Sequence, residues 1–236
     1  MAREVSRPGT STPGVSKENE VTDFLSKLQA RGGEAGGGRL IFALDATASR
    51  QPSWDQASHL QAEMFTAAHA LGGLSVQLVF YRGYRECKAS PWLNDSAELL
   101  RRMTSVSCRA GHTQIERILR HAAKEARKAK VDALVFVGDA VEEAIDDLGN
   151  AAGELGLLGL PCFMFHEGHN PRVRQAFEEV AKLSGGACCS FDASSAGQLR
   201  DLLGAVAAYA AGGRRALLNY GAKRGGPVAL LTRQVR

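Results

Sequence analysis

A short apolar run at residues 40–44, Leu-Ile-Phe-Ala-Leu, is followed at once by oxygen-bearing side chains at alternate positions. An apolar run of this length that ends in polar residues is typical of a buried β-strand. The side chains that follow it are Asp45, Thr47 and Ser49. Because open α/β sheets bind their ligands just outside the carboxyl ends of the strands, these three residues are predicted to lie at a ligand site. Carboxylate and hydroxyl oxygens are hard ligands, which suit Mg²⁺ or Mn²⁺.

Strand-like and helix-like segments alternate along most of the remaining chain. Amphipathic stretches and short apolar runs follow one another, and a short segment after the turn at Arg82-Gly83 predicts an antiparallel strand. This order predicts an α/β fold: a doubly wound, mostly parallel sheet with one short antiparallel edge strand and helices on both faces, which is a Rossmann-like architecture. The predicted strands are 40–44, 76–81, 84–88, 133–137, 161–165 and 188–191, and the predicted helices are 54–71, 96–105, 114–129, 147–157, 171–183 and 196–210.

Composition divides the 236-residue chain into three parts. Residues 1–38 are rich in Gly, Ser, Thr and Pro, which predicts a flexible arm, and four apolar residues within it outline a short amphipathic helix. Residues 39–212 form the predicted domain. Residues 213–236 hold six basic and no acidic side chains, so they predict a basic tail that accounts for the formal net charge of +4. The four apolar residues of the arm are Val21, Phe24, Leu25 and Leu28.

Several classes of protein are not expected from these features. No apolar run approaches the roughly 18 residues of a membrane span, and no apolar block follows the first arginines, so we expect neither a membrane segment nor a secretory signal. The five cysteines are odd in number and show no framework spacing, which indicates a reduced, cytoplasmic protein. The basic tail lacks an aromatic-rich surface, so nucleic acid is not an expected partner. No glycine-rich nucleotide motif or serine-hydrolase elbow follows a predicted strand.

Two further loops supply groups of the same chemistry as the first one. Thr113 precedes an amphipathic helix, and Asp139 directly follows the strand predicted at 133–137. Because the carboxyl ends of parallel strands share one edge of a sheet, both residues are predicted to join the three that follow the first strand. Two carboxylates and three hydroxyls would form a site for a hard divalent cation, with water at the remaining positions. Local alternatives are a capping box between Thr113 and Glu116, a helix cap at Asp139 and a turn at Ser49.

This set of residues resembles the metal-ion-dependent adhesion site of the von Willebrand factor A (VWA) domain family. The family pattern is Asp-x-Ser-x-Ser after the first strand, a distant Thr and a later Asp. The resemblance covers about residues 39–212, and residues 177–186 also look like the family's penultimate helix and turn. Two departures are Thr47 in place of the usual Ser and Ala140 in place of the usual Gly. The matching residues are Asp45, Thr47, Ser49, Thr113 and Asp139, and Glu142 and Glu143 are candidate additional ligands.

The resemblance implies a protein-binding domain that is not an enzyme. It implies that the hydroxyls of Thr47 and Ser49 bind Mg²⁺ or Mn²⁺ directly, that the two aspartates act largely through water, and that Thr113 does either. An open coordination position would then accept an acidic side chain of a partner protein. Bacterial members of such families often act as adaptors beside ATPase or chelatase machines, so such a complex is an expected partner.

An enzymatic alternative stays open from the sequence. The haloacid dehalogenase phosphatases are similar in placing a nucleophilic Asp after their first strand, as at Asp45, and a later Gly-Asp with further acids, as in residues 138–143. A Mg²⁺-dependent phosphohydrolase of this type would normally have an acid where Thr47 stands, to protonate the leaving group. It would also have a Lys before the later Asp, for which the chain offers only Lys124, Lys128 and Lys130.

Overall fold

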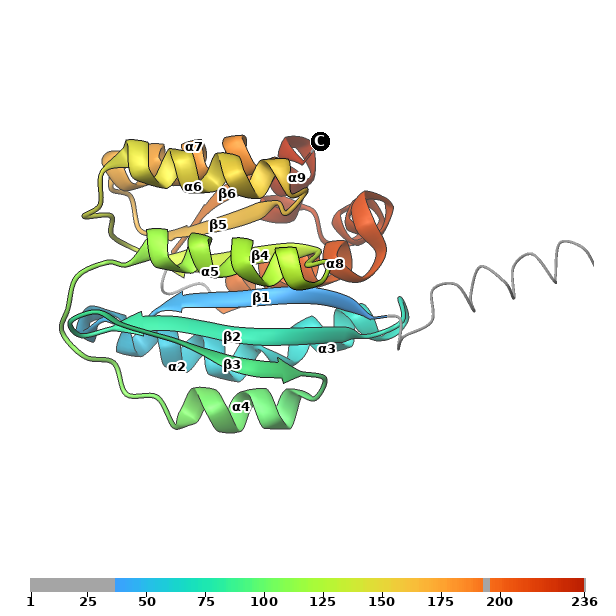
Figure 1. Cartoon of the computed structure of the whole chain (residues 1–236). Helices are drawn as coiled ribbons and strands as arrows, with labels where there is room; N and C mark the ends of the chain where they lie inside the picture. The colour runs from blue at the N-terminus through green and yellow to red at the C-terminus, as the bar shows by residue number, and fades with distance from the viewer. Residues whose placement is uncertain (1–36, 193–195, 236) are drawn as a thin grey trace, which may run out of the picture. The chain divides into compact units, whose positions relative to one another are not determined.

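The structure is a computed structural model that describes residues 37–192 and 196–235. It contains a six-stranded sheet with the strand order β3-β2-β1-β4-β5-β6. Neighbouring strands are parallel except β2 and β3, which are antiparallel at one edge. The predicted fold class, a mostly parallel sheet with one antiparallel edge strand, is thereby confirmed (Figure 1). The strands are β1 (Gly38–Asp45), β2 (Leu74–Arg82), β3 (Glu86–Leu93), β4 (Ala133–Gly138), β5 (Cys162–Glu167) and β6 (Ala187–Phe191).

Helices cover both faces of the sheet (Figure 1). Three of them, α5 (Ile115–Lys128), α6 (Ile145–Leu157) and α7 (Pro171–Ser184), pack on one face. None of the helices in the described part of the chain has both the length and the apolar content that a membrane span needs. The opposite face carries α2 (Gln51–Leu60), α3 (Ala62–His69), α4 (Ser96–Thr104), α8 (Ala196–Arg224) and α9 (Gly226–Gln234), and a 3-10 turn, η1 (Ala48–Arg50), precedes α2.

The side chains of β1 alternate between two separate cores. Leu40, Phe42 and Leu44 pack with the helices on the α2 side, whereas Ile41 and Ala43 pack with those on the α5 side. Because both faces are covered, the strand is apolar throughout, which is why a plain apolar run predicted it correctly. Alternation continues past Ala43, so the next residue on the α5 side is the carboxylate Asp45, at the end of the strand.

The strand order changes direction at β1. β2 pairs with one side of β1 and β4 pairs with the other, so the loops that follow β1 and β4 leave the sheet in opposite directions. An arrangement of this kind leaves a crevice outside the carboxyl ends of the two strands. Asp45 ends β1, and Gly138 ends β4 immediately before Asp139. The topology therefore brings the two predicted aspartates to the same edge.

Residues 213–235, for which the sequence predicts a basic tail, are helical and pack on the domain. Gly213 adopts a positive φ of 67° and kinks α8, after which α8 and α9 turn back onto the sheet. Leu217, Val228 and Leu231 are fully buried in the core on the α2 side. The predicted arm, residues 1–38, lies outside the described residues except for Gly37 and Gly38.

The C-terminal helix also covers the open edge of β6. The Gln234 Nε2 group donates to the backbone oxygen of Cys188 at 3.0 Å, and the Cys188 N–H donates to Gln234 Oε1 at 2.9 Å. A single side chain thus satisfies both backbone groups of an edge residue, which is one way in which proteins protect an exposed strand. Cys188 and Cys189 face opposite cores and are free thiols.

Candidate metal centre

One pocket at the carboxyl edge of the sheet brings the predicted ligands together. Its lining comes from the loop after β1, the loop before α5 and the loop after β4. Asp45, Thr47 and Thr113 are buried, Asp139 is half-buried, and Ser49 is exposed. The predicted residues that line it are Asp45, Thr47, Ser49, Thr113, Asp139 and Glu142.

Asp45 carries the least satisfied polar group of this pocket. Its Oδ1 accepts a hydrogen bond from the Thr47 N–H at 2.7 Å, whereas its Oδ2 is buried without a hydrogen-bond partner among the described residues. The hydroxyl of Tyr81, the residue paired with Asp45 in β2, lies nearby but falls short of hydrogen-bond geometry. Burial raises the pKa of Asp45, and this rise is reduced by Thr47, by Tyr81 and by the positive charge of Arg50, each of which lowers the pKa. A buried carboxylate oxygen without a partner is costly and would be relieved by a cation.

Arg50 is a buried cation that the sequence analysis missed. It ends the 3-10 turn after β1 and is 2% exposed. Its Nη2 lies 2.6 Å from Glu167 Oε2 and its Nη1 lies 3.7 Å from Asp139 Oδ2. The guanidinium therefore contacts two acids: Asp139, which follows β4, and Glu167, which ends β5. No local pattern predicts this, because an Arg in a turn is usually solvated.

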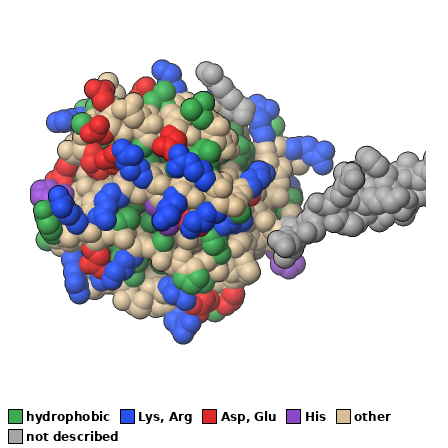
Figure 2. Space-filling model, viewed as in Figure 1, with side chains coloured by type: hydrophobic (Ala, Val, Ile, Leu, Met, Phe, Trp, Pro, Cys, Tyr) green, Lys and Arg blue, Asp and Glu red, His purple; other side chains and the backbone are tan. Residues whose placement is uncertain are grey.

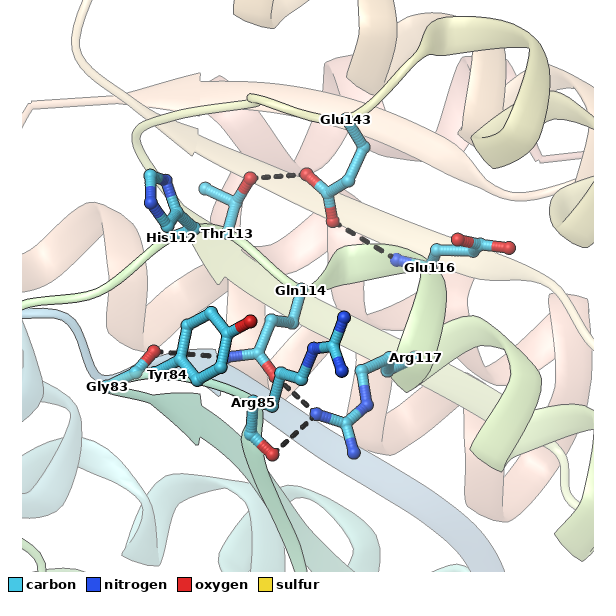
Figure 3. A pocket seen from close by; sticks show the side chains of 9 residues that line it. All are labelled: Gly83, Tyr84, Arg85, His112, Thr113, Gln114, Glu116, Arg117 and Glu143. Carbon is cyan, nitrogen blue, oxygen red and sulfur yellow. Dashed lines mark hydrogen bonds between the residues drawn. The ribbon is translucent and has the colours of Figure 1, made fainter.

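Thr113 is held by the two glutamates that follow β4. Its hydroxyl donates to Glu143 Oε2 and accepts from the backbone N–H of Glu142 at 2.9 Å, while its own N–H donates to Glu142 Oε2 at 2.8 Å. Glu143 Oε1 also accepts from the N–H groups of Ile115 and Glu116 at the start of α5 (Figure 3). A carboxylate from another loop thus caps this helix, in place of the predicted Thr113–Glu116 capping box.

His166 is buried close to Asp139 and Arg50 but does not line the pocket. It lies in β5 opposite Gly138, is fully buried, and stacks edge-on against Phe177 at 5.8 Å between ring centroids. Neither ring nitrogen has a hydrogen-bond partner in the described structure. Burial lowers the pKa of His166, so the ring is neutral at pH 7.

The donors of the pocket fit a hard cation better than a soft one. The described residues contain no group of three His, Cys, Asp or Glu side chains that could hold a metal ion, so a site here would depend on hydroxyl oxygens. The carboxylates of Asp45, Asp139 and Glu142 line the pocket, and the guanidinium of Arg50 beside Asp139 is shared with Glu167, so acidic groups outnumber the buried cation. A divalent cation would reduce this excess of negative charge. The unpartnered Oδ2 of Asp45 gives such an ion a ready ligand.

The phosphohydrolase alternative finds less support in this pocket. No lysine lines it, and the charge beside Asp139 is the buried Arg50. Lys128 instead pairs with Glu125 near the far end of α5, away from the carboxyl edge of the sheet. The acid that would protonate a leaving group is absent at Thr47, whose N–H is bonded to Asp45.

Comparisons with known proteins give structural likenesses alone. No protein-family model matches the sequence, and no curated protein matches it. The VWA domain of SpRpn10 superposes with a TM-score of 0.54 at 11% identity, covering 69% of this chain and 95% of that domain. The PilB minor pilin from Streptococcus sanguinis gives 0.59 at 10% identity, over 83% of this chain and 64% of the pilin. Proximal thread matrix protein 1 from the mussel byssus gives 0.57 at 13% identity, over 73% and 47%. The chain is therefore similar in fold to a VWA domain, and at these identities the likeness extends to the fold alone.

Proposed function

We propose that this chain is a protein-binding domain whose contact with its partner depends on a divalent cation, Mg²⁺ or Mn²⁺, held after β1. The observation that carries the proposal is the buried, unpartnered Oδ2 of Asp45 in a pocket that also holds Thr47, Ser49, Thr113 and Asp139. We further propose that the domain binds and does not catalyse, and that its partner presents an acidic side chain. An adaptor role beside an ATPase or chelatase complex is the corresponding expectation for the partner.

The residues of the pocket divide into ligands and supports. Thr47 and Ser49 would contribute hydroxyl oxygens, and Asp45 and Asp139 would contribute carboxylates. Arg50 fixes Asp139 from the buried side, while the Thr47 N–H orients Asp45. A bound Mg²⁺ or Mn²⁺ would supply an open coordination position for a carboxylate oxygen of the partner. The Thr113 hydroxyl can bind the ion only after its hydrogen bond to Glu143 is broken. The position of the loop that carries Glu143 would therefore decide whether Thr113 is a ligand.

Calorimetric titration with Mn²⁺ tests the proposal directly. Asp45→Asn keeps the size of the side chain and removes its charge, so we expect Mn²⁺ affinity to fall about tenfold or more. The matched control is Asp55→Asn, an exposed acid on α2 that does not line the pocket and accepts a hydrogen bond from Gln51. The control should bind as the parent protein does. Absence of Mn²⁺ binding to the parent protein, or equal binding by both variants, contradicts the proposal.

A capture experiment then tests the functional step. Tagged protein is incubated with a cell extract in Mn²⁺ or in EDTA, and retained proteins are compared for the parent, Asp45→Asn and Asp55→Asn forms. We expect a partner that is retained in Mn²⁺ by the parent and the control and lost in EDTA or with Asp45→Asn. If the partner is retained equally in EDTA and by the Asp45→Asn form, the contact lies on another surface and the proposal is contradicted.

A further inference from the structure

A second pocket lies beside the candidate metal centre and shares Thr113 with it (Figure 3). One wall is the turn between β2 and β3, with Tyr84 and Arg85 at its tip. The other wall is the start of α5, with Gln114 and Arg117. Its volume is about 290 Å³, enough for one acidic side chain and a neighbouring group. The two pockets together draw their linings from four loops: those after β1 and β4, the β2–β3 turn and the loop before α5.

Within the described part of the chain, no ion pair is formed by the two arginines of this second pocket. Arg85 and Arg117 line it, and neither has an ion-pair partner within the described residues. The two glutamates in the lining are already engaged: Glu116 pairs with Arg120 at 2.6 Å, and Glu143 caps the start of α5. Two guanidinium groups without ion-pair partners therefore line a pocket whose own carboxylates are engaged by other groups, an arrangement that an incoming anion stabilises.

Arg117 is held in place before any ligand arrives. Its Nη1 donates to the backbone oxygen of Arg85 at 2.7 Å and to Gln114 Oε1 at 2.6 Å. Gln114 in turn donates to the backbone oxygen of Gly83 at 3.4 Å, which ties α5 to the hairpin. Fixing one edge of the guanidinium leaves its remaining N–H groups oriented, so less side-chain entropy is lost on binding.

The surroundings favour a peptide as the occupant. Tyr84 is 80% exposed at the tip of the hairpin, with the Arg85 guanidinium 5.3 Å from its ring centroid. An exposed Tyr beside an Arg is a common pair at protein interfaces. Figure 2 shows Lys and Arg side chains gathered over the face where α5 lies, and this helix exposes further basic residues that would attract an acidic chain. They are Lys124, which has no ion pair among the described residues, and Arg120, Arg127 and Lys128, which each pair with one Glu.

We propose that the Arg85–Arg117 pocket binds a carboxylate of an acidic peptide segment of the partner, next to the carboxylate that enters the candidate metal centre. The planar fork of a guanidinium matches a carboxylate, and Glu116 and Glu143 in the same lining keep the net charge of the pocket low, so a singly charged group suits it better than a doubly charged one. This inference rests on the proposed function for its second anchor, whereas the arginine pocket itself needs no cation.

The test is fluorescence anisotropy with a fluorescein-labelled hexaglutamate peptide, against a hexaglutamine peptide as the neutral probe. Arg85→Gln keeps the backbone oxygen that holds Arg117, so it removes the charge without removing that bond. The matched control is Arg215→Gln, an exposed Arg on α8 without an ion pair among the described residues. We expect hexaglutamate to bind and hexaglutamine not to bind, with about a three- to fivefold weaker affinity for Arg85→Gln and none lost for the control.

The outcomes separate the two proposals. If Arg85→Gln weakens binding equally in Mn²⁺ and in EDTA, and Mn²⁺ adds nothing, the arginine pocket stands and the metal proposal falls. If Mn²⁺ strengthens binding while Arg85→Gln behaves as Arg215→Gln does, the arginine pocket falls and the metal proposal stands. A phosphoserine peptide that binds far more tightly than hexaglutamate through Arg85 would overturn the assignment of the ligand as a carboxylate.

Discussion

Replacing Arg50 by Met tests whether its buried charge holds the candidate centre together. Met fills a similar volume but leaves Asp139 and Glu167 without their shared cation. Removing one partner of a buried ion pair typically costs about 3–5 kcal/mol, because the remaining charge is left uncompensated. The side chains of Glu167 and Asp139 are 13% and 32% exposed, and the 2.6 Å contact of Arg50 lacks hydrogen-bond geometry. The expected loss is therefore at the low end, about 3 kcal/mol.

Urea unfolding in EDTA, followed by the fluorescence of the buried Trp54 and the half-buried Trp92, measures this loss. For a domain of this size about 3 kcal/mol corresponds to a fall in Tm of about 6–12 °C. The double variant Arg50→Met with Glu167→Met removes one of the stranded charges, so it should recover about 1 kcal/mol or more. The control Arg172→Met replaces an exposed Arg on α7 and should change stability by no more than about 0.5 kcal/mol. A loss below about 1 kcal/mol for Arg50→Met would refute the reasoning.

Three more outcomes follow from the same edge of the sheet and from the core. Glu143→Ala removes the cap of α5, so the free energy of unfolding measured in urea should fall by about 1 kcal/mol. The same change releases the Thr113 hydroxyl, so Mn²⁺ should bind more tightly in a titration. Weaker Mn²⁺ binding would contradict this prediction. Gly111→Ala places a Cβ 2.1 Å from a backbone oxygen of the β2–β3 turn and should cost about 1–3 kcal/mol, where an unchanged urea midpoint would be the contrary result. Iodoacetamide at pH 8 should alkylate three cysteines slowly until the protein unfolds, because burial raises the pKa of each thiol to about 12. The three are Cys162, Cys188 and Cys189. Mass spectrometry measures the labelling, and fast labelling of the folded protein would contradict this prediction.

The fold was predictable from the sequence because each element carries its own local signal. The strand predicted at residues 40–44 is β1, and the amphipathic stripe at 114–129 is α5, within one residue at each end. Period and length separate such runs without knowledge of the rest of the chain. The convergence of Asp45 and Asp139 followed from the parallel sheet, since two strand ends share an edge.

Local signals failed where distant residues decide the outcome. The helix predicted at 54–71 is divided at Gln61, whose side chain donates to the backbone oxygen of Ser96 at 3.1 Å. Glu143 replaces the predicted cap of α5 from 27 or more positions along the chain. The burial of Arg50 depends on Glu167, at the end of a strand that lies two positions away in the sheet. None of these pairs produces a periodic pattern in the sequence, so they become visible only in the three-dimensional structure.

The bond pair between Gln234 and Cys188 has a consequence for how the protein is handled. Removing the last turn of α9 would leave the backbone of β6 open to pairing with another copy, which is the usual route to strand-mediated aggregation. Light scattering of a version shortened after residue 230 should therefore show growing particles where the intact chain stays monodisperse. The side-chain amide of Gln234 is thus expected to oppose self-association through the edge of β6.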